Sequence, residues 1–477
     1  MTMNLKKYEQ VAQRVEKLIA DGVIKSGTKV PSIRQMSKQM NFSIMTILEG
    51  YQLLETKGII ESKPQSGYFV KSDFLRSSDS WLRLPEARAE NITIYTDYVD
   101  LSESVENLFN EAMDNTVVPL GAGLPDAEFL PLEEINKRMA RIVRSIDVNR
   151  YSIGSGTKEL RDSLSRHMIG CGCTVSADEI SVTGGAIQAL MLALRAVAQP
   201  GDAVAVESPG YYGFYSMLKF LNLRAIEIPS HPQNGISVEA LEKILKKKEA
   251  VSSVLLSPCF SNPTGSSMPL SEKKKLIKLA EQYDLPLIED DIYGEISYGD
   301  ERPCALKSIN NDQVIYLSSM SKTIAPGYRV GWISGGKYHK DIERCHALSV
   351  LAVATPNQLL ISSLLDDNIF KRHLKKLRKS YYENMVLFQN KIAHCFPDGT
   401  RTSNPQGGYF LWIELPCGCD SKSLAQKARK ENISIAPGMI FSSRDSYKNY
   451  IRLNCAVPWS QEIEDALEKL GELIRDR

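Results

Sequence analysis

The residues VIYLSSMSKTIAPGYRVG, numbered 314–331, indicate both the architecture and the chemistry of the longer part of this chain. They begin with a β-branched, apolar run typical of a buried strand, and a turn of small residues follows it. Lys322 stands in this turn. A buried amine has a lowered pKa and can act as a nucleophile. Ser319, Ser321 and Arg329, which flank the lysine, can bind one phosphate group together.

Strands and helices alternate over most of the chain from Gly121 onward. Short β-branched runs occur at 179–183, 202–209, 224–229, 251–258, 285–291, 314–319 and 328–334. Helical stretches separate most of them, at 186–198, 238–246 and 271–283. The pattern predicts an α/β fold with a mostly parallel sheet and helices on both faces. After Leu364, a helix-rich stretch and short strands near 407–415, 434–438 and 449–456 predict a small C-terminal α/β subdomain.

Two more polar positions follow predicted strands, and they suit an aromatic aldehyde phosphate held as an imine. Asp290 ends the run LPLIEDD, where a carboxylate can keep a pyridine nitrogen protonated. Asp291 is the alternative, because neighbouring strand residues face opposite sides. We favour Asp290 because Tyr293 then lies within reach of the phenolate oxygen of the ring. Asn262, in SNPTG, would donate to the same oxygen.

The turn TGGAIQAL predicts an anion site at the start of a helix. Its glycines allow the backbone N–H groups of Gly185, Ala186 and Ile187 to point at a phosphate. Tyr211, in ESPGYYG, is placed to stack on an aromatic ring, and Tyr212 is its rival. Arg452, in YIRLNCA, is a candidate to bind a substrate carboxylate with two hydrogen bonds.

As a set, these motifs resemble the fold-type I aminotransferases, which are similar to aspartate aminotransferase and use pyridoxal 5′-phosphate (PLP). The likeness runs from Gly121 to Leu473. It implies that Lys322 forms the Schiff base with PLP and that Asp290 pairs with the pyridinium. It implies further roles for the other residues, namely phenolate ligands (Asn262, Tyr293), phosphate ligands (Ser319, Ser321, Arg329) and a carboxylate ligand (Arg452). Tyr151, in NRYSIGSG, matches a tyrosine that reaches the phosphate of a neighbouring subunit, which implies a homodimer. Ile187 departs from the family, because many relatives have a polar residue there.

The first 70 residues have the pattern of a winged helix–turn–helix. Apolar residues at helical spacing predict a helix over 5–20, and Pro31 with Ser32 predicts the start of a second. Ser43 can cap a third helix, whose predicted buried side is Ile44, Ile47, Leu48, Tyr51 and Leu54. Two short apolar runs around Pro64 and Gly67 then predict a hairpin. Such a fold places one helix in the major groove of DNA.

This head resembles the GntR-type DNA-binding domain in the stretches PSIRQMSKQM, SIMT, YQLLETKGII and PQSGYFV. The resemblance implies DNA contacts from Ser32, Arg34, Ser43, Thr46 and Gly67. Relatives commonly carry arginines where this chain has Ile44 and Leu48, and Glu49 follows, so the base contacts differ. A head used only for protein contacts is the alternative. Head and body together resemble the MocR family of transcriptional regulators, whose dimers place each head on the other subunit's body.

Charge and composition agree with a DNA-binding head on a larger body. Residues 1–72 carry a net charge of +5, whereas the whole 477-residue chain carries +1. The excess of cations suits a polyanion, although it could also arise by chance. Nine cysteines without paired CxxC motifs indicate a reduced, cytoplasmic chain, and no metal site is expected. No apolar run is long enough to predict a membrane span.

The sequence therefore predicts three segments: a DNA-binding domain at 1–72, a linker with one short helix at 73–112, and a PLP-binding body at 113–477. The predicted function is that of a PLP-dependent, DNA-binding transcriptional regulator that senses PLP or an amino compound. The first alternative is an active aminotransferase with the head as an appendage. A binding module with a vestigial PLP site is the second, and the complete set of motifs argues against it.

Overall fold

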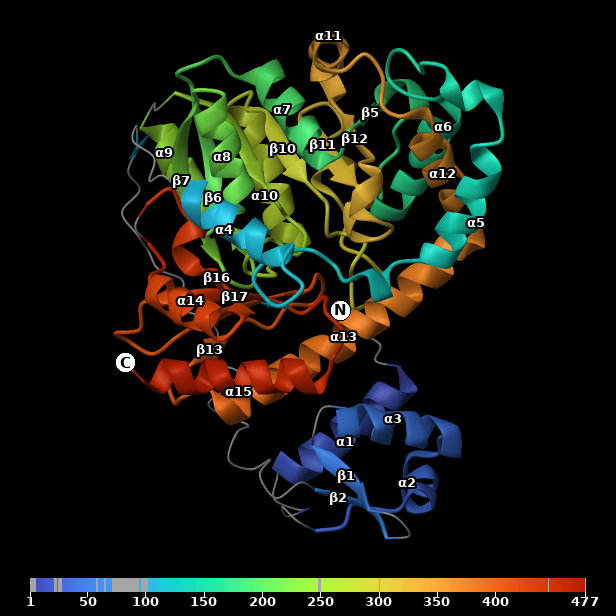
Figure 1. Ribbon diagram of the computed structural model, residues 1–477, viewed down its shortest axis with the longest axis vertical. Coiled ribbons are helices and arrows are strands. Elements are labelled where there is room, and N and C mark those ends of the chain that lie inside the picture. The colour runs from blue at the N-terminus through green and yellow to red at the C-terminus, as the bar shows by residue number, and fades with distance from the viewer. Residues whose placement is uncertain are drawn as a thin grey trace.

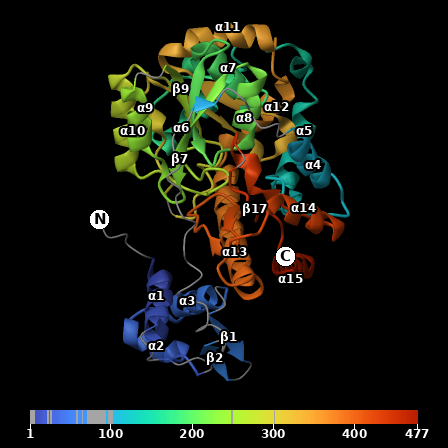
Figure 2. The same ribbon diagram turned by 90° about the vertical axis from the view of Figure 1, so that its left-hand side faces the viewer.

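The computed structural model describes residues 6–20, 24, 28–56, 59–63, 66–70, 94–95, 102–247, 250–299, 301–444 and 446–476. It contains a small N-terminal head and a larger body, as the sequence predicts (Figure 1). Both views show the head below the body, with its third helix beside the long helix α13 (Figures 1 and 2).

The head contains three helices and an antiparallel hairpin: α1 (Lys7–Ala20), α2 (Ile33–Met40), α3 (Ile44–Thr56), β1 (Ile60–Lys63) and β2 (Gly67–Val70). Val11, Val15, Met36, Ile47, Tyr51 and Leu54 form its core. A Cβ at Gly50 would lie 2.7 Å from the Val11 Cβ, so this glycine lets α3 pack closely on α1. The predicted winged helix–turn–helix is confirmed. One detail of the prediction is wrong, because the Ile44 side chain is 54% exposed rather than buried.

The body is built on a nine-stranded sheet. The strands of its main path run in the order β3 (Ile94–Tyr95), β7 (Arg224–His231), β6 (Ala203–Ser208), β9 (Val251–Leu256), β10 (Leu287–Asp290), β11 (Val314–Ser319), β12 (Gly331–Ser334) and β5 (Ser181–Thr183). β8 (Gly235–Ile236) pairs with β7. The strands from β7 to β11 are parallel, and β12 is antiparallel to both of its neighbours. The predicted mostly parallel sheet is therefore present.

Helices cover both faces of this sheet because successive strand residues point in opposite directions. Val204 and Val206 of β6 pack with α7 (Ala186–Val197) and α8 (Tyr212–Phe220) on one face. Ala203 and Ala205 pack with α9 (Val238–Lys246) and α10 (Leu270–Gln282) on the other. A third core lies at the β5 end of the sheet. The remaining helices of the large part are α5 (Leu132–Ile142), α6 (Lys158–Met168), α11 (His339–Ser349) and α12 (Thr355–Leu365).

The predicted C-terminal subdomain is a four-stranded antiparallel sheet with helices. Its strands run in the order β13 (Arg401–Thr402), β14 (Phe410–Glu414), β17 (Tyr450–Asn454) and β16 (Ala436–Pro437), and its helices are α14 (Ser421–Lys430) and α15 (Gln461–Arg475). Just before β16, β15 (Ile433–Ser434) pairs instead with β4 (Val118–Pro119), from the start of the body. α4 (Ser102–Ala112) also packs here, because its buried Leu108 lies in a cluster with Trp412 and Phe441.

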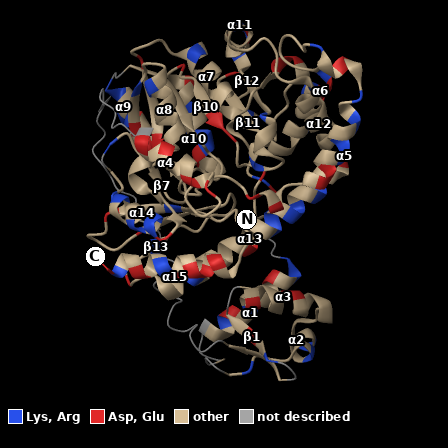
Figure 3. Cartoon of the chain, in the orientation of Figure 1, with Lys and Arg blue, Asp and Glu red and all other residues tan. Residues whose placement is uncertain are grey.

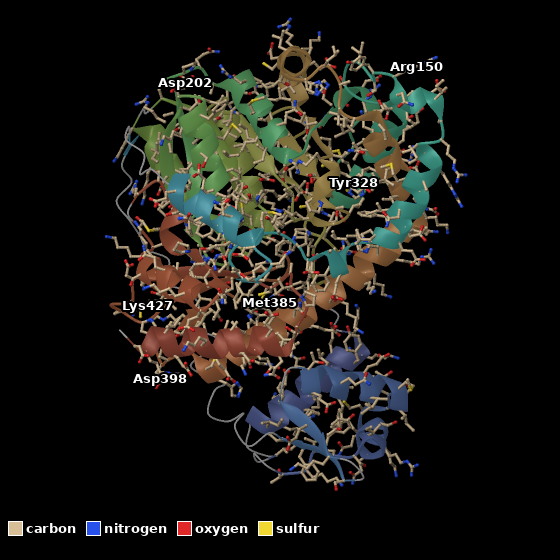
Figure 4. The ribbon with its side chains drawn as sticks, viewed as in Figure 1. Arg150, Asp202, Tyr328, Met385, Asp398 and Lys427 are labelled. Carbon is tan, nitrogen blue, oxygen red and sulfur yellow. The ribbon has the colours of Figure 1, made fainter. Side chains whose placement is uncertain are left out.

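The helix α13 (Asn368–Cys395) joins the two parts of the body. Its first half contributes Phe370, Leu374 and Tyr381 to the core of the large part. Its second half, which begins near Met385, packs in the core of the C-terminal subdomain (Figure 4). None of the helices among the described residues is both long and apolar enough to span a membrane.

Candidate functional site

A cavity of about 210 Å³ lies where several strands of the large sheet end at their carboxyl termini. This is where ligands bind in open α/β sheets. The lining residues come from α4, from the segment after β4, from the starts of α7 and α8, and from the turns after β9, β10 and β11. They are Phe109, Gly123, Leu124, Ala186, Ile187, Leu190, Tyr211, Tyr212, Ser257, Asn262, Asp290, Ile292, Tyr293, Ser321, Lys322 and Arg329. The fold thus gathers nine of the predicted cofactor-binding residues around one cavity.

Lys322 presents its amine to this cavity from the turn after β11. Its Nζ donates a hydrogen bond to the Gly123 carbonyl oxygen at 2.8 Å. Burial, with help from the charges of Arg452 and Arg329, lowers the pKa of Lys322 from 10.5 to about 8. No ion pair joins it to a carboxylate among the described residues. About a tenth of the amine is therefore neutral and nucleophilic at pH 7, far more than for an ordinary lysine.

The structure separates the two adjacent aspartates. Asp290 lines the cavity, and burial raises its pKa to about 7, while a hydrogen bond from the Ile292 N–H (3.2 Å) acts in the opposite direction. Asp291 instead forms a buried ion pair with Arg302 and accepts a hydrogen bond from the Tyr316 hydroxyl at 2.8 Å. Only Asp290 is placed to meet a ligand. A cationic ring nitrogen beside it would favour its ionised form.

Arg452 is fully buried on β17, although it has no carboxylate partner within ion-pair distance among the described residues. Its Nη1 donates to the Asn262 Oδ1 at 2.9 Å, and its Nη2 donates to the Gly121 carbonyl oxygen. The guanidinium carbon lies 4.4 Å from the centre of the Phe410 ring. Its Nε has no hydrogen-bond partner. A buried cation without a counter-charge is costly, so this geometry suits an anionic ligand.

The predicted phosphate ligands lie close together. Ser319 and Ser321 share a hydrogen bond of 2.8 Å, and Arg329 Nη1 donates to the Ser321 Oγ at 3.3 Å. Arg329 Nη2 also donates to the Gly184 carbonyl oxygen at 3.1 Å. Gly185, with φ of +100°, brings the start of α7 so close that a Cβ there would lie 2.4 Å from Arg329 Nη2. A helix N-terminus, an arginine fork and a hydroxyl therefore converge.

These observations test whether the residues suit PLP. Two cationic residues, Lys322 and Arg329, and one carboxylate, Asp290, line the cavity, and Arg452 lies outside the lining but near enough to Lys322 for its charge to lower the pKa of that amine. The excess of positive charge matches a cofactor that carries a phosphate together with an amino compound that carries a carboxylate. A carboxylate for the ring nitrogen, an amine for the aldehyde and a phosphate site are all present. The residues suit the cofactor.

Both candidate stacking tyrosines border the cavity. Their ring centres are 4.6 Å apart and the rings are tilted by 52°. Burial raises the pKa of each hydroxyl. Tyr211 packs edge-on against Phe214, whereas Tyr212 packs edge-on against Phe109 of α4. Both tyrosines are placed to stack on a ring in the cavity, so the preference for Tyr211 over Tyr212 stays a prediction.

Several site residues were not predicted. Glu207, at the end of β6, is buried, and its Oε1 accepts hydrogen bonds from the Ser257 N–H (3.0 Å) and the Ser261 hydroxyl (2.9 Å). Burial raises the pKa of Glu207 to about 8. The carboxyl thus fixes the turn that carries Asn262. Phe109 was also missed, because α4 was expected to belong to a linker.

Tyr151 does not line the cavity. It is 75% exposed, and its neighbour Arg150 lies at the outer surface of the body (Figure 4). Ser319 likewise lies behind Ser321 rather than in the lining. Tyr293 and Asn262 do border the cavity. The resemblance assigned Tyr151 to a neighbouring subunit, so its absence from this subunit's cavity is in keeping with that role.

The predicted DNA-contacting residues lie on the head. Ser32 caps α2, since its Oγ accepts a hydrogen bond from the Gln35 N–H, and Arg34 is exposed on the same helix. Ser43 Oγ accepts from the Thr46 N–H at 3.1 Å and so caps α3. Gly67, with φ of +96°, starts the second strand of the wing.

Comparisons with known proteins agree with both parts. The family "Aminotransferase class I and II" matches residues 115–470, and "Bacterial regulatory proteins, gntR family" matches residues 7–70. The chain is 36% identical to the HTH-type transcriptional regulator YjiR of Escherichia coli over 98% of each chain. It is 34% identical to YdcR of the same organism, over 99% of this chain and 100% of the relative.

Solved structures show the same body. The multiple substrate aminotransferase of Thermococcus profundus superimposes with a TM-score of 0.73 and 27% identity, over 79% of this chain and 95% of that one. The kynurenine aminotransferase of Pyrococcus horikoshii gives 0.73 and 30%, over 78% and 94%. Both resemblances are confirmed, and the chain belongs to the HTH-type transcriptional regulators of the MocR type, in which a gntR-family head is joined to an aminotransferase class I and II body.

Proposed function

We propose that this regulator binds PLP at Lys322 and that amino compounds reaching the cofactor change how its head binds DNA. The observation that carries the proposal is the cavity lined by Lys322, Arg329 and Asp290, with the buried Arg452 near Lys322. PLP, when bound, supplies an aldehyde that condenses with primary amines and a ring that accepts electrons.

Each predicted site residue has a defined role in this proposal. Lys322 provides the neutral amine at which the cofactor attaches, and Asp290 holds a proton at the ring nitrogen. Asn262 and Tyr293 bind the phenolate oxygen, and Tyr211 stacks on the ring. The phosphate is bound by Ser319, Ser321, Arg329 and the N–H groups of Gly185, Ala186 and Ile187. Arg452 orients the carboxylate of an incoming amino acid.

The attachment site can be tested directly. Purified protein is incubated with PLP, reduced with borohydride and digested, and the modified peptide is identified by mass spectrometry. We expect the mass of the reduced cofactor on Lys322 and on no other lysine. Lys322→Ala is the negative variant, and Lys273→Ala removes a buried lysine outside the cavity. Absence of uptake, or modification of a different lysine, refutes the assignment.

The head is proposed to bind duplex DNA through Ser32, Arg34, Ser43, Thr46 and Gly67. For a ligand to regulate it, the ligand must bind one arrangement of heads more tightly than another. A duplex from the protein's own promoter should bind more tightly than an unrelated duplex at equal salt. Equal affinities would contradict sequence-specific regulation. A cytoplasmic location follows from this role, since the protein must reach the chromosome.

A homodimer is part of the same proposal. Ile146, Tyr151, Ile153 and Leu351 are large apolar or aromatic side chains that are each more than half exposed. Their segments lie together, because the Thr355 hydroxyl donates to the Arg150 carbonyl oxygen at 3.0 Å. Such a patch suits an interface with a second copy. The division into domains at 1–72, 73–112 and 113–477 also stays a prediction.

An active aminotransferase is the second candidate, since Arg452 leaves a carboxylate site beside the cofactor site. Supplying the PLP-loaded protein with one amino acid at a time, together with a different 2-oxo acid that accepts the amino group, and measuring release of the 2-oxo acid derived from the amino acid distinguishes the two. Steady release over many turnovers supports the enzyme. A change in absorbance without release supports the sensor.

A further inference from the structure

The first turn of α3 presents apolar side chains to solvent. Ile44 is 54% exposed and Met45 is 64% exposed, and no other large hydrophobic residue is exposed to this degree in the described part of the head. α3 contains no lysine or arginine. A recognition helix without lysine or arginine cannot form the hydrogen bonds that these residues donate to guanine, so it must contact bases through other groups.

Packing of the head does not require these two side chains. The buried side of α3 is formed by Ile47, Gly50, Tyr51 and Leu54. The buried Tyr51 hydroxyl donates to the Pro31 carbonyl oxygen at 2.6 Å, which fixes α3 against the entry to α2. Ile44 and Met45 therefore sit on a helix that is held rigidly by other residues, and they point away from its core.

The surroundings of this turn suit a nucleic acid. Ser43 caps the helix with its hydroxyl, and Lys7 places its Nζ 5.6 Å from the centre of the Phe42 ring, directly before the cap. Arg34 and Lys38 are exposed on α2, which Figure 3 shows with Lys and Arg in blue. Cations that neutralise phosphates thus flank an apolar turn.

We propose that Ile44 and Met45 read the 5-methyl groups of thymines in the major groove. This inference rests on the proposed binding of the head to duplex DNA. In helix–turn–helix proteins the N-terminal residues of the second helix of the motif contact base edges. The thymine methyl is the apolar group that the major groove offers to such side chains. Glu49, exposed one turn later, can accept a hydrogen bond from the amino group of a cytosine.

The test uses the full-length protein and a pool of random-sequence duplexes. The most enriched duplex is resynthesised with uracil in place of thymine at one position at a time, which removes only the methyl group. We expect a loss of affinity of about fivefold at one or more clustered thymines, because each buried methyl contributes on this scale. Ile44→Ala or Met45→Ala should abolish the difference between thymine and uracil at its own position.

Two variants serve as controls. Ile44→Val keeps a branched apolar side chain and should retain most of the methyl effect. Lys38→Ala should weaken thymine and uracil duplexes equally and reduce the dependence on salt. Circular dichroism checks that each head is folded.

The outcomes separate this inference from the proposed function. If no duplex is enriched above nonspecific binding, DNA recognition by the head fails, and the inference fails with it. If a duplex is enriched but uracil binds as well as thymine at every position, only the inference is overturned. Binding that Ile44→Ala leaves unchanged, together with loss of a protein–protein association, also overturns it, because the turn would then bind protein.

Discussion

Replacing Lys322 by methionine should stabilise the cofactor-free protein while it removes the cofactor attachment site. The structure provides the reason, because the amine faces the cavity from a largely buried position, lies near Arg452 and Arg329, and has a pKa of about 8 instead of 10.5. Folding therefore places a group that is protonated at pH 7 in surroundings that disfavour its charge. A methionine of similar length fills the space without that charge.

The magnitude follows from the pKa. A lowering from 10.5 to about 8 corresponds to roughly 3 kcal/mol at pH 7. The variant loses the hydrogen bond to the Gly123 carbonyl oxygen, which offsets about 1 kcal/mol. A net gain of about 2 kcal/mol is expected. The sign depends on pH: between about 8 and 10.5 the unfolded chain keeps its proton and the folded chain does not, so wild-type stability rises and the advantage of the variant disappears.

Urea unfolding of the cofactor-free protein measures this effect. Three of the four tryptophans, Trp332, Trp412 and Trp459, belong to the body and none belongs to the head, so a change in their fluorescence on unfolding reports the body. Wild type and variant are compared near pH 7, below both pKa values, and near pH 10.5, well above the folded value and at the unfolded one. A variant that is less stable at pH 7, or whose advantage persists near pH 10.5, would refute the reasoning.

Lys273→Met is the matched control. Lys273 is more deeply buried than Lys322, and its Nζ donates to the Cys304 carbonyl oxygen at 2.6 Å and to the Cys259 Sγ at 3.2 Å. Burial lowers its pKa, but the nearby Cys259 and Glu289 outweigh this and raise it. This substitution should destabilise the body at pH 7, because it removes a satisfied cation.

Substitutions at three further residues, Gly185, Glu207 and Arg452, examine other parts of the site. Gly185→Ala should weaken binding of PLP and of inorganic phosphate by about tenfold or more, because the added methyl would lie 2.4 Å from Arg329 Nη2. Gly154→Ala is the control, since Gly154 also has a positive φ (+94°) but an added methyl there would meet no atom within 4 Å. It should leave both affinities unchanged in the same titrations. Glu207→Gln should alter urea stability little at pH 7, since burial raises the pKa of Glu207 to about 8, whereas Glu207→Ala should cost about 2 kcal/mol. Arg452→Met should still take up PLP but lose amino-acid affinity about a hundredfold, measured from the cofactor absorbance; an unchanged amino-acid titration would contradict the carboxylate role.

Much of the fold could be predicted because its signals are local. Periodicity placed the helix over 238–246 to the residue, and capping residues located α2 and α3. The pairing of β15 with β4 could not be predicted, because their residues lie more than three hundred positions apart and only packing brings them together. The same limit hid Phe109, since nothing in its own segment shows that α4 packs on the body.

The site was predictable where a residue type and its strand end sufficed. Alternation along β10 left Asp290 and Asp291 as rivals, and the deciding feature is Arg302, which binds Asp291. Glu207 carried no local signal, because its partners Ser257 and Ser261 come from another loop. In the head, apolar spacing alone assigned Ile44 to the core. The first residue of a helix can lie beyond the surface that the rest of the helix packs against, and Ile44 is exposed for this reason.

Because one continuous helix supplies side chains to the cores of both parts of the body, neither part can melt while the other keeps its full packing. α13 has 28 residues, and no break separates the half that ends near Tyr381 from the half that begins near Met385. Hydrogen exchange should therefore report a single slow class of amides across α13, with similar opening free energies in both halves. Any shift of the C-terminal subdomain on ligand binding must then move the whole of α13. The head lies beside this helix, so the movement would reach the head.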